Sequence, residues 1–150
     1  MRKKILLLVS VALIMTSCSN ILEHQAGNSI NKYYKALKDQ DYEEAFKHLY
    51  LFDKDPSEGE TSLSSNEAKA VFLNKIKNLE NENYRVVDFK IKDIEYEDGH
   101  SFWHEIVITI EHNGSAFDYS ENAFYHDGKL QISGEDPFIQ FRDGKMDTSL

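Results

Sequence analysis

Residues 84–134, YRVVDFKIKDIEYEDGHSFWHEIVITIEHNGSAFDYSENAFYHDGKLQISG, carry the clearest structural pattern in this sequence. Asp-Gly or Asn-Gly pairs interrupt them at 98–99, 113–114 and 127–128. Such pairs are typical of two-residue hairpin turns, because Asn, Asp and Gly tolerate the positive φ angles that these turns require. The pattern therefore predicts four consecutive strands in an antiparallel meander.

The first predicted strand changes the side on which its apolar residues lie. They alternate through Val87, Phe89 and Ile91, and the alternation then shifts by one position to Ile94. Since side chains alternate strictly along a regular strand, the shift predicts a β-bulge near 92–93.

Three helices are predicted before the sheet. Helical spacing begins at Asn28 or Ser29 and continues to about Lys38. Asp41 and Ser64 then stand as N-caps of two further helices, each with a Glu three residues later, as in a capping box. The polar residues 53–65 between them predict a surface loop.

These elements predict one α+β domain over residues 28–134, with three N-terminal helices packed on a curved four-stranded antiparallel meander. Residues 135–150 are expected to form a C-terminal tail. The apolar group at 137–141, PFIQF, predicts that the tail docks in part on the domain.

Two segments resemble a known superfamily. Residues 33–46, YYKALKDQDYEEAF, are similar to the opening helix pair of small exported lipoproteins of the nuclear transport factor 2-like (cystatin-like) superfamily. Residues 127–132, DGKLQI, resemble their closing strand, where a Trp commonly stands at the position of Leu130. The resemblance covers about residues 28–134 and implies a cone-like fold. It implies no single activity, because the superfamily contains isomerases, dehydratases, transport factors and lipoproteins of unknown role.

The N-terminal residues 1–20, MRKKILLLVSVALIMTSCSN, have the layout of a secretory signal peptide: a cationic start, an apolar run and small residues before Cys18. The apolar run, 5–15, is 11 residues long, whereas a membrane-spanning helix needs about 20. Residues 15–18, MTSC, resemble a bacterial lipobox, which implies a signal peptide over 1–17 and lipidation of Cys18 by palmitate-like acyl chains. Residues 18–27 would then form a short tether. The alternative is an ordinary signal peptide that contains a cysteine.

Charge and cysteine content restrict the partners. Without residues 1–17 the chain has 14 Lys and Arg against 26 Asp and Glu, a formal charge of −12. This excess disfavours binding to nucleic acid and adsorption to anionic lipid, so we expect attachment to the membrane through the lipid anchor. Cys18 is the only cysteine, so no disulfide, Cys-ligated metal or cysteine nucleophile is expected. The predicted location is the outer face of a bacterial cell membrane, and the Lys- and Asn-rich composition suggests a Gram-positive source.

His104 is the candidate for acid–base chemistry. It shares the parity of Ile106, Ile108 and Ile110, and it is the one titratable group on the predicted core face of the second strand. A partly buried histidine can act as a base near neutral pH. The alternative is a structural histidine near the end of a strand.

A metal site is a second possibility. In a meander, the first and third turns lie at the same end of the sheet, which would gather Asp98, His100, His126 and Asp127. Zinc accepts two His and a carboxylate, but no HExxH-like spacing supports the site. Acidic turns with histidines also occur in plain hairpins, and no metal or other cofactor is predicted.

Aromatic residues offer a third possibility. Tyr33, Tyr34 and Tyr42 on the helices would meet Tyr119 or Phe124 and line a pocket for a small apolar or ring-bearing ligand, or these residues would simply form the core. Trp103 has the opposite parity to the isoleucine row, so it would be exposed and mark a partner surface.

We therefore expect an exported, membrane-anchored lipoprotein whose domain is a non-enzymatic binding or protein-interaction module. One alternative is a small-molecule acid–base enzyme, isomerase- or dehydratase-like, that uses His104. Another is a homodimeric assembly module formed on the open sheet face around Trp103.

Overall fold

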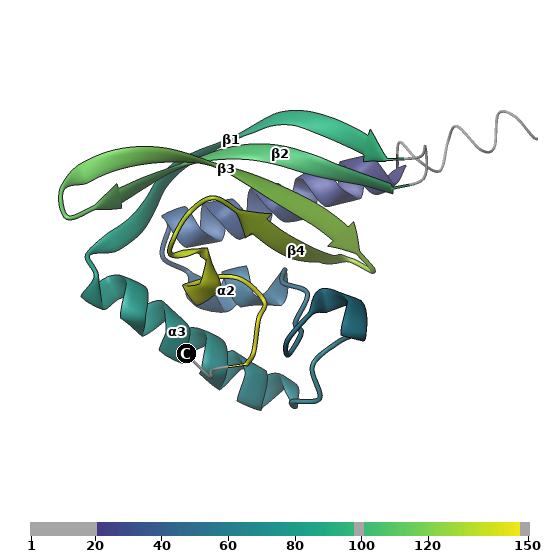
Figure 1. Cartoon of the computed structure of the whole chain (residues 1–150), viewed down its shortest axis with the longest axis horizontal. Coiled ribbons are helices and arrows are strands. Elements are labelled where there is room, and N and C mark those ends of the chain that lie inside the picture. The colour runs from purple at the N-terminus through teal and green to yellow at the C-terminus, as the bar shows by residue number, and fades with distance from the viewer. Residues whose placement is uncertain (1–20, 98–100, 148–150) are drawn as a thin grey trace, which may run out of the picture.

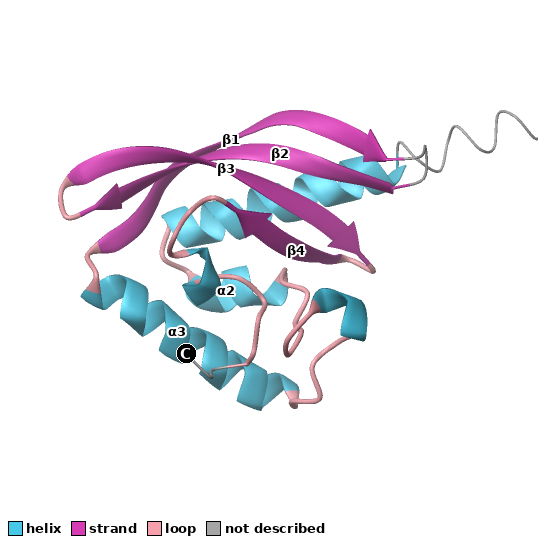
Figure 2. Cartoon of the chain, viewed as in Figure 1, coloured by secondary structure: helices cyan, strands magenta, loops and turns pink. Residues whose placement is uncertain are grey.

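The computed structural model describes residues 21–97 and 101–147, in which helices precede a four-stranded sheet (Figures 1 and 2). The strands are β1 (Tyr84–Glu97), β2 (Ser101–His112), β3 (Ser115–His126) and β4 (Lys129–Gly134). They lie in sequence order, and each is antiparallel to the next. The predicted α+β class and antiparallel meander are confirmed.

Two of the predicted hairpin turns are present. Asn113 and Gly114 have φ angles of 51° and 80°, and Asp127 and Gly128 have φ angles of 45° and 87°. A left-handed conformation at both central positions is what a type I′ turn requires, and it matches the twist of the flanking strands. The first of the three predicted turns along the chain, at 98–99, lies outside the described residues.

β1 contains two bulges. Its register against β2 shifts between Ile91 and Asp93, as the sequence predicted, and again between Val86 and Asp88. Val87, which the sequence pattern placed on the inner parity, is the extra residue of the second bulge. The inner residues on either side of the bulges pair with the buried isoleucines of β2: Val86 with Ile110, Phe89 with Ile108, and Ile91 with Ile106.

The N-terminal helix begins earlier than predicted. Residues 21–38 are helical, so the expected start at Asn28 was wrong. Ala26 is fully buried and lies four residues before Ile30 on the same face. A small residue adds little to a hydrophobic pattern, which is why the first two turns were missed. None of the described helices is long and apolar enough to cross a membrane. Cys18 and the predicted signal peptide lie outside the described residues.

The other helices have the predicted caps. In α2 (Tyr42–Lys47) the Asp41 carboxylate accepts a hydrogen bond from the Glu44 amide. In α3 (Ser65–Asn81) Ser64 and Glu67 form both bonds of a capping box. Between them the predicted loop contains one short 3₁₀ turn, η1 (Pro56–Glu58).

Helices and sheet enclose one hydrophobic core. The ring of Tyr34, from the N-terminal helix, stacks on Phe89 of β1 with 5.3 Å between centroids. The ring of Phe46 in α2 packs against that of Phe72 in α3, with 5.6 Å between the ring centroids. The core also contains the buried isoleucines of β2 and Leu130 of β4.

Residues 135–147 belong to this core, so the expectation of a partly docked tail understated their role. After β4 the chain forms η2 (Ile139–Phe141), and Arg142 and Met146 are buried. The segment then runs beside residues 50–53. The Phe52 amide donates to the Gly144 carbonyl at 3.0 Å, and the Met146 amide donates to the Phe52 carbonyl at 2.7 Å. Figure 1 shows this yellow segment passing between the sheet and α3.

Candidate functional site

The sheet divides into two hairpins at one end. Pairing between β2 and β3 extends only to Trp103 and Phe124. Beyond that pair, β1 and β2 stay paired up to Glu97 with Ser101, and β3 and β4 stay paired up to His126 with Lys129. The two hairpins therefore diverge and leave a fork, which Figure 1 shows next to the start of the N-terminal helix.

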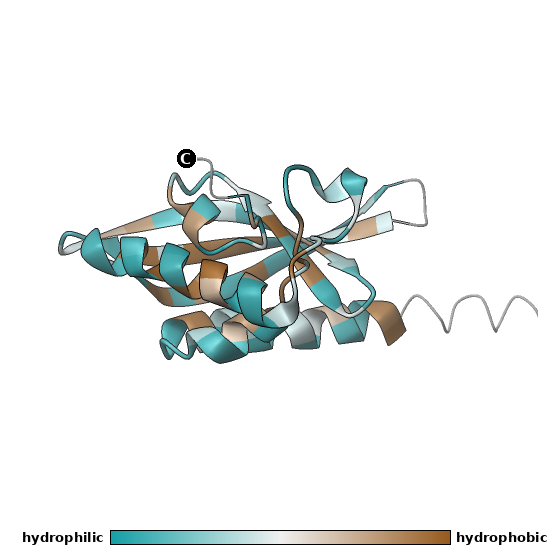
Figure 3. Ribbon diagram, turned by 90° about the horizontal axis from the view of Figure 1, so that it is seen from below, coloured by the Kyte–Doolittle hydropathy of each residue, from teal (hydrophilic) through white to brown (hydrophobic). Residues whose placement is uncertain are grey.

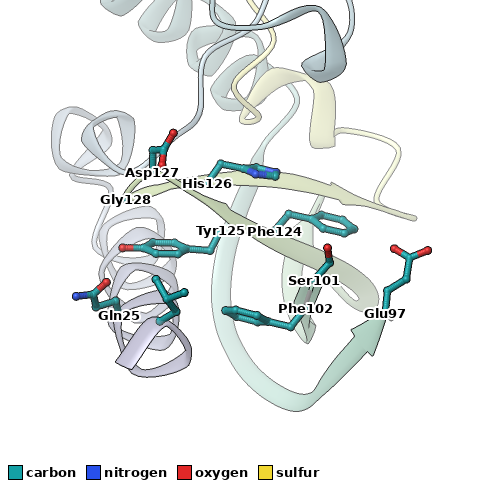
Figure 4. A pocket seen from close by; sticks show the side chains of 10 residues that line it. Gln25, Glu97, Ser101, Phe102, Phe124, Tyr125, His126, Asp127 and Gly128 are labelled. Atoms are coloured by element: carbon teal, nitrogen blue, oxygen red, sulfur yellow. The ribbon is translucent and has the colours of Figure 1, made fainter. Parts of the chain in front are cut away.

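A hollow of about 740 Å³ lies at this fork. Leu22 and Gln25 of the N-terminal helix line one side of it, and aromatic residues of β2 and β3 line the other. In Figure 4 the rings of Phe102 and Tyr125 extend toward the helix, whereas Phe124 and His126 extend to the opposite side of the sheet. The hollow thus has aromatic walls on the side that the helix covers.

Polar groups stand around these walls. Ser101, Glu97, His126 and Asp127 also line the hollow. Apolar walls with a few polar groups are the usual composition of a small-molecule site, in which the walls supply affinity and the polar groups fix orientation. The fork meets this description, although it is open to solvent rather than enclosed.

His104 lies next to the fork but within the core. Its side chain is only 2% exposed, as its parity predicted, and its ring meets Phe102 edge-on at 5.7 Å. Burial lowers its pKa, which the Glu23 carboxylate partly opposes. Among the described residues its Nδ1 atom has no hydrogen-bond partner. A catalytic histidine is normally oriented by a partner on its second nitrogen, and among the described residues the Nδ1 atom of His104 has none.

Of the four residues considered as a possible metal site, the structure describes only two. Asp98 and His100 lie outside the described residues. His126 is exposed and lies 5.7 Å from the ring of Tyr50. Within residues 21–97 and 101–147, no group of three or more His, Cys, Asp or Glu side chains is placed to hold a metal ion.

The candidate tyrosines lie apart from the hollow. Tyr33 and Tyr34 are fully buried, and their hydroxyls donate to the Arg142 carbonyl at 2.7 Å and to the Glu121 carboxylate at 2.5 Å. Tyr119 is half-buried against the core, paired with Ile108. Tyr42 also packs against the core, whereas Phe124 is the one residue of the expected aromatic set that lines the hollow.

Trp103 is half-buried rather than exposed. Its ring lies 5.6 Å from that of Phe124 on the outer face of the sheet. Polar cross-strand pairs cover the same face: Lys92 with Glu105, Thr109 with Asp118, and Arg85 with Glu111. On this face the Trp103–Phe124 ring pair therefore lies beside polar and charged pairs.

The sequence reasoning missed a buried charge cluster. Arg142 is fully buried, and its guanidinium donates to both oxygens of Glu121 and, at 2.6 Å, to Asp136. Its Nε atom donates to the Tyr84 hydroxyl at 2.9 Å, and that hydroxyl donates to Asp136 at 2.5 Å. Burial opposes the charge of Arg142, but the neighbouring Glu121 carboxylate and the tyrosines hold its pKa well above the usual value.

The tyrosines of the cluster remain hydrogen-bond donors. Burial raises the pKa of Tyr33, Tyr34 and Tyr84 far above the ordinary value, so their hydroxyls keep their protons. Every charged group of the cluster is thereby hydrogen-bonded inside the core, which makes the cluster a structural element. No short sequence motif predicts this cluster, because its members are far apart in the chain, at positions 33–34, 84, 121, 136 and 142.

A second buried ion pair fixes the C-terminal segment to α3. Lys75 is 6% exposed, and its ammonium donates to the Asp143 carboxylate at 2.7 Å and to the Lys145 carbonyl at 2.7 Å. Burial lowers the pKa of Lys75, and Asp143 partly opposes that effect.

No protein-family model and no curated protein sequence matches this chain.

Proposed function

We propose that the protein is an exported bacterial lipoprotein, anchored by acyl chains on Cys18, whose cone-like domain binds a ligand without transforming it. The N-terminal sequence supports the anchor, and the aromatic hollow at the fork supports the binding role. The proposed membership of the nuclear transport factor 2-like superfamily rests on the resemblance of residues 33–46 and 127–132 together with the α+β order of elements.

The observation that carries the binding role is the composition of the hollow. Phe102 and Tyr125 face Leu22 across it, while the one buried titratable side chain nearby, His104, points into the core without a partner for Nδ1 among the described residues. An acid–base enzyme on this fold would require a reactive group that is both oriented and shielded from water at the ligand, whereas the titratable groups that line the hollow, Glu97, His126 and Asp127, are exposed. His104 remains the residue through which that alternative would act.

Lipidation is tested by metabolic labelling with a fatty-acid probe in the producing bacterium. We expect the wild-type protein to take up the probe and fractionate with membranes. The Cys18→Ala variant should take up none, because it lacks the thiol to which the lipid is attached. Equal labelling of both proteins would contradict the anchor.

Ligand binding is tested by titrating N-phenyl-1-naphthylamine into a solution of the protein that contains residues 19–150. This neutral apolar dye fluoresces when it binds in an apolar site. We expect Phe102→Ala to weaken dye binding about tenfold, since truncating a phenyl ring removes apolar contact equivalent to at least about 1.4 kcal/mol.

Phe117→Ala serves as the matched control for the dye. Phe117 is 44% exposed and lies in β3 near the opposite end of the sheet. Its truncation should leave dye binding unchanged. The same loss in both variants, or no dye binding by the wild type, would argue against the hollow as a ligand site.

A further inference from the structure

Exposed apolar side chains gather at the fork end of the molecule. The exposed large apolar residues of the described chain are Ile21, Leu22, Tyr96 and Phe117. Leu22 lines the hollow, and the carboxylate of the adjacent Glu23 lies near enough to Tyr96 to raise the pKa of its hydroxyl. The ring of Tyr96 also lies 6.4 Å from that of Phe102. Three of the four therefore form one patch, Ile21, Leu22 and Tyr96, which we name the fork patch.

The fork patch begins close to the predicted anchor. Ile21 is the third residue after Cys18, and a fully extended chain spans at most about 3.6 Å per residue, or about 11 Å over this distance. Of the short tether expected over residues 18–27, residues 21–27 are instead part of the N-terminal helix. Figure 3 shows the apolar first turn of this helix, coloured brown, beside the end of the sheet.

We propose that the fork patch lies on the surface of the lipid bilayer, so that the hollow opens at the membrane interface. The inference rests on the proposed lipidation of Cys18, because acyl chains in the bilayer hold that residue at headgroup level. Tyrosine favours the interface between water and lipid, and Ile and Leu favour the apolar side of it. The patch therefore orients a domain that the anchor already holds.

The carboxylates around the fork patch limit how deeply it can enter the bilayer. Glu23 and Glu97 flank the patch, and the chain after the signal peptide is strongly acidic. Carboxylates are costly to place in hydrocarbon, so the patch rests among the headgroups without entering the acyl region. A ligand that reaches the hollow from this side would be an amphiphile with an apolar part and a polar head.

The test uses the lipidated full chain, reconstituted in vesicles of phosphatidylcholine and phosphatidylglycerol. In the wild type the Cys18 thiol is consumed by the lipid, so a cysteine introduced elsewhere is the only site for a thiol-reactive NBD dye. Two variants are compared, Tyr96→Cys in the fork patch and Phe117→Cys at the opposite end of the sheet. Both replace an exposed aromatic residue of a strand. Phosphatidylcholine with a nitroxide spin label on its headgroup then serves as the quencher.

We expect the headgroup-labelled lipid to reduce NBD emission at position 96 at least twofold and to leave emission at position 117 unchanged, because a nitroxide quenches only a dye that lies close to it and the patch lies at headgroup level. Equal quenching at both positions, quenching at 117 alone, or quenching at neither would overturn the proposed orientation. Labelling of the wild-type protein would mean that Cys18 is free, which overturns the anchor itself and is a separate result.

Discussion

Replacement of Arg142 by Met should lower the free energy of unfolding by about 3–5 kcal/mol, because it leaves the carboxylates of Glu121 and Asp136 buried without a counter-charge. Met has a similar shape to the arginine stem, so lost packing contributes little. Domains of this size are stable by about 5–15 kcal/mol, so the variant should lose a large part of its stability. Urea unfolding of residues 19–150, followed by the fluorescence of Trp103, measures the change.

Arg85→Met is the matched control for this substitution. Arg85 also pairs with a glutamate, Glu111 at 2.8 Å, but its side chain is 54% exposed. Exposed pairs contribute about 0–1 kcal/mol, so the control should unfold near the wild-type urea concentration. Arg142→Lys extends the series if Arg142→Met fails to fold, because lysine keeps the charge and loses the bidentate bond; it should be intermediate. Equal effects at positions 85 and 142 would show that burial of the cluster has no energetic importance.

Gly144→Ala should also be strongly destabilising. A Cβ atom at this position would lie 1.8 Å from the carbonyl oxygen of Tyr50. The obstacle is backbone, which cannot rotate away as a side chain can, so the segments at 50–53 and 143–147 would have to separate. Overpacking of this kind costs about 1–3 kcal/mol or more. The hydrogen bonds of Phe52 to Gly144 and Met146 should weaken with it, as amide hydrogen exchange at residues 52 and 146 would measure.

Gly27→Ala controls for the loss of glycine flexibility. Gly27 lies within the N-terminal helix, and a Cβ atom added there would meet no atom of the surrounding elements within 4 Å. Alanine should stabilise that helix by about 0.5–1 kcal/mol. A destabilised Gly27→Ala variant, or a Gly144→Ala variant as stable as the wild type, would contradict the packing described for the C-terminal segment.

The parts of the fold that the sequence predicted correctly are those with local causes. The Asn113-Gly114 turn, the Ser64 capping box and the bulge near Lys92 each depend on a few adjacent residues. The bulge at Val87 was missed because two valines in succession satisfy either parity. The early start of the N-terminal helix was missed because Ala26 is too small to mark its buried face.

The candidate site was harder to predict because its parts depend on tertiary structure. The parity argument placed His104 in the core correctly. The meander places the paired strand residues Glu97 and Ser101 at the same end of the sheet as His126 and Lys129. The divergence of the two hairpins, however, has no sequence signature, so Phe102 and Tyr125 were not recognised as walls of a hollow. Tyr33 and Tyr34 were considered for ligand binding because the sequence did not show that their hydroxyls have partners inside the core. Those partners belong to the buried charge cluster, which includes Arg142, and the sequence had placed Arg142 in a C-terminal tail.

The position of Arg142 has a consequence for the order of events during folding. Its carbonyl accepts from Tyr33, 109 positions earlier in the chain, and its Nε atom donates to Tyr84, 58 positions earlier. Contacts so distant in sequence form late and slowly. Until Arg142 has reached its place, the Glu121 carboxylate lacks its guanidinium partner. In a chain that crosses a membrane unfolded, as proposed above for this protein, the buried charges would therefore be paired only after residue 142 has also crossed.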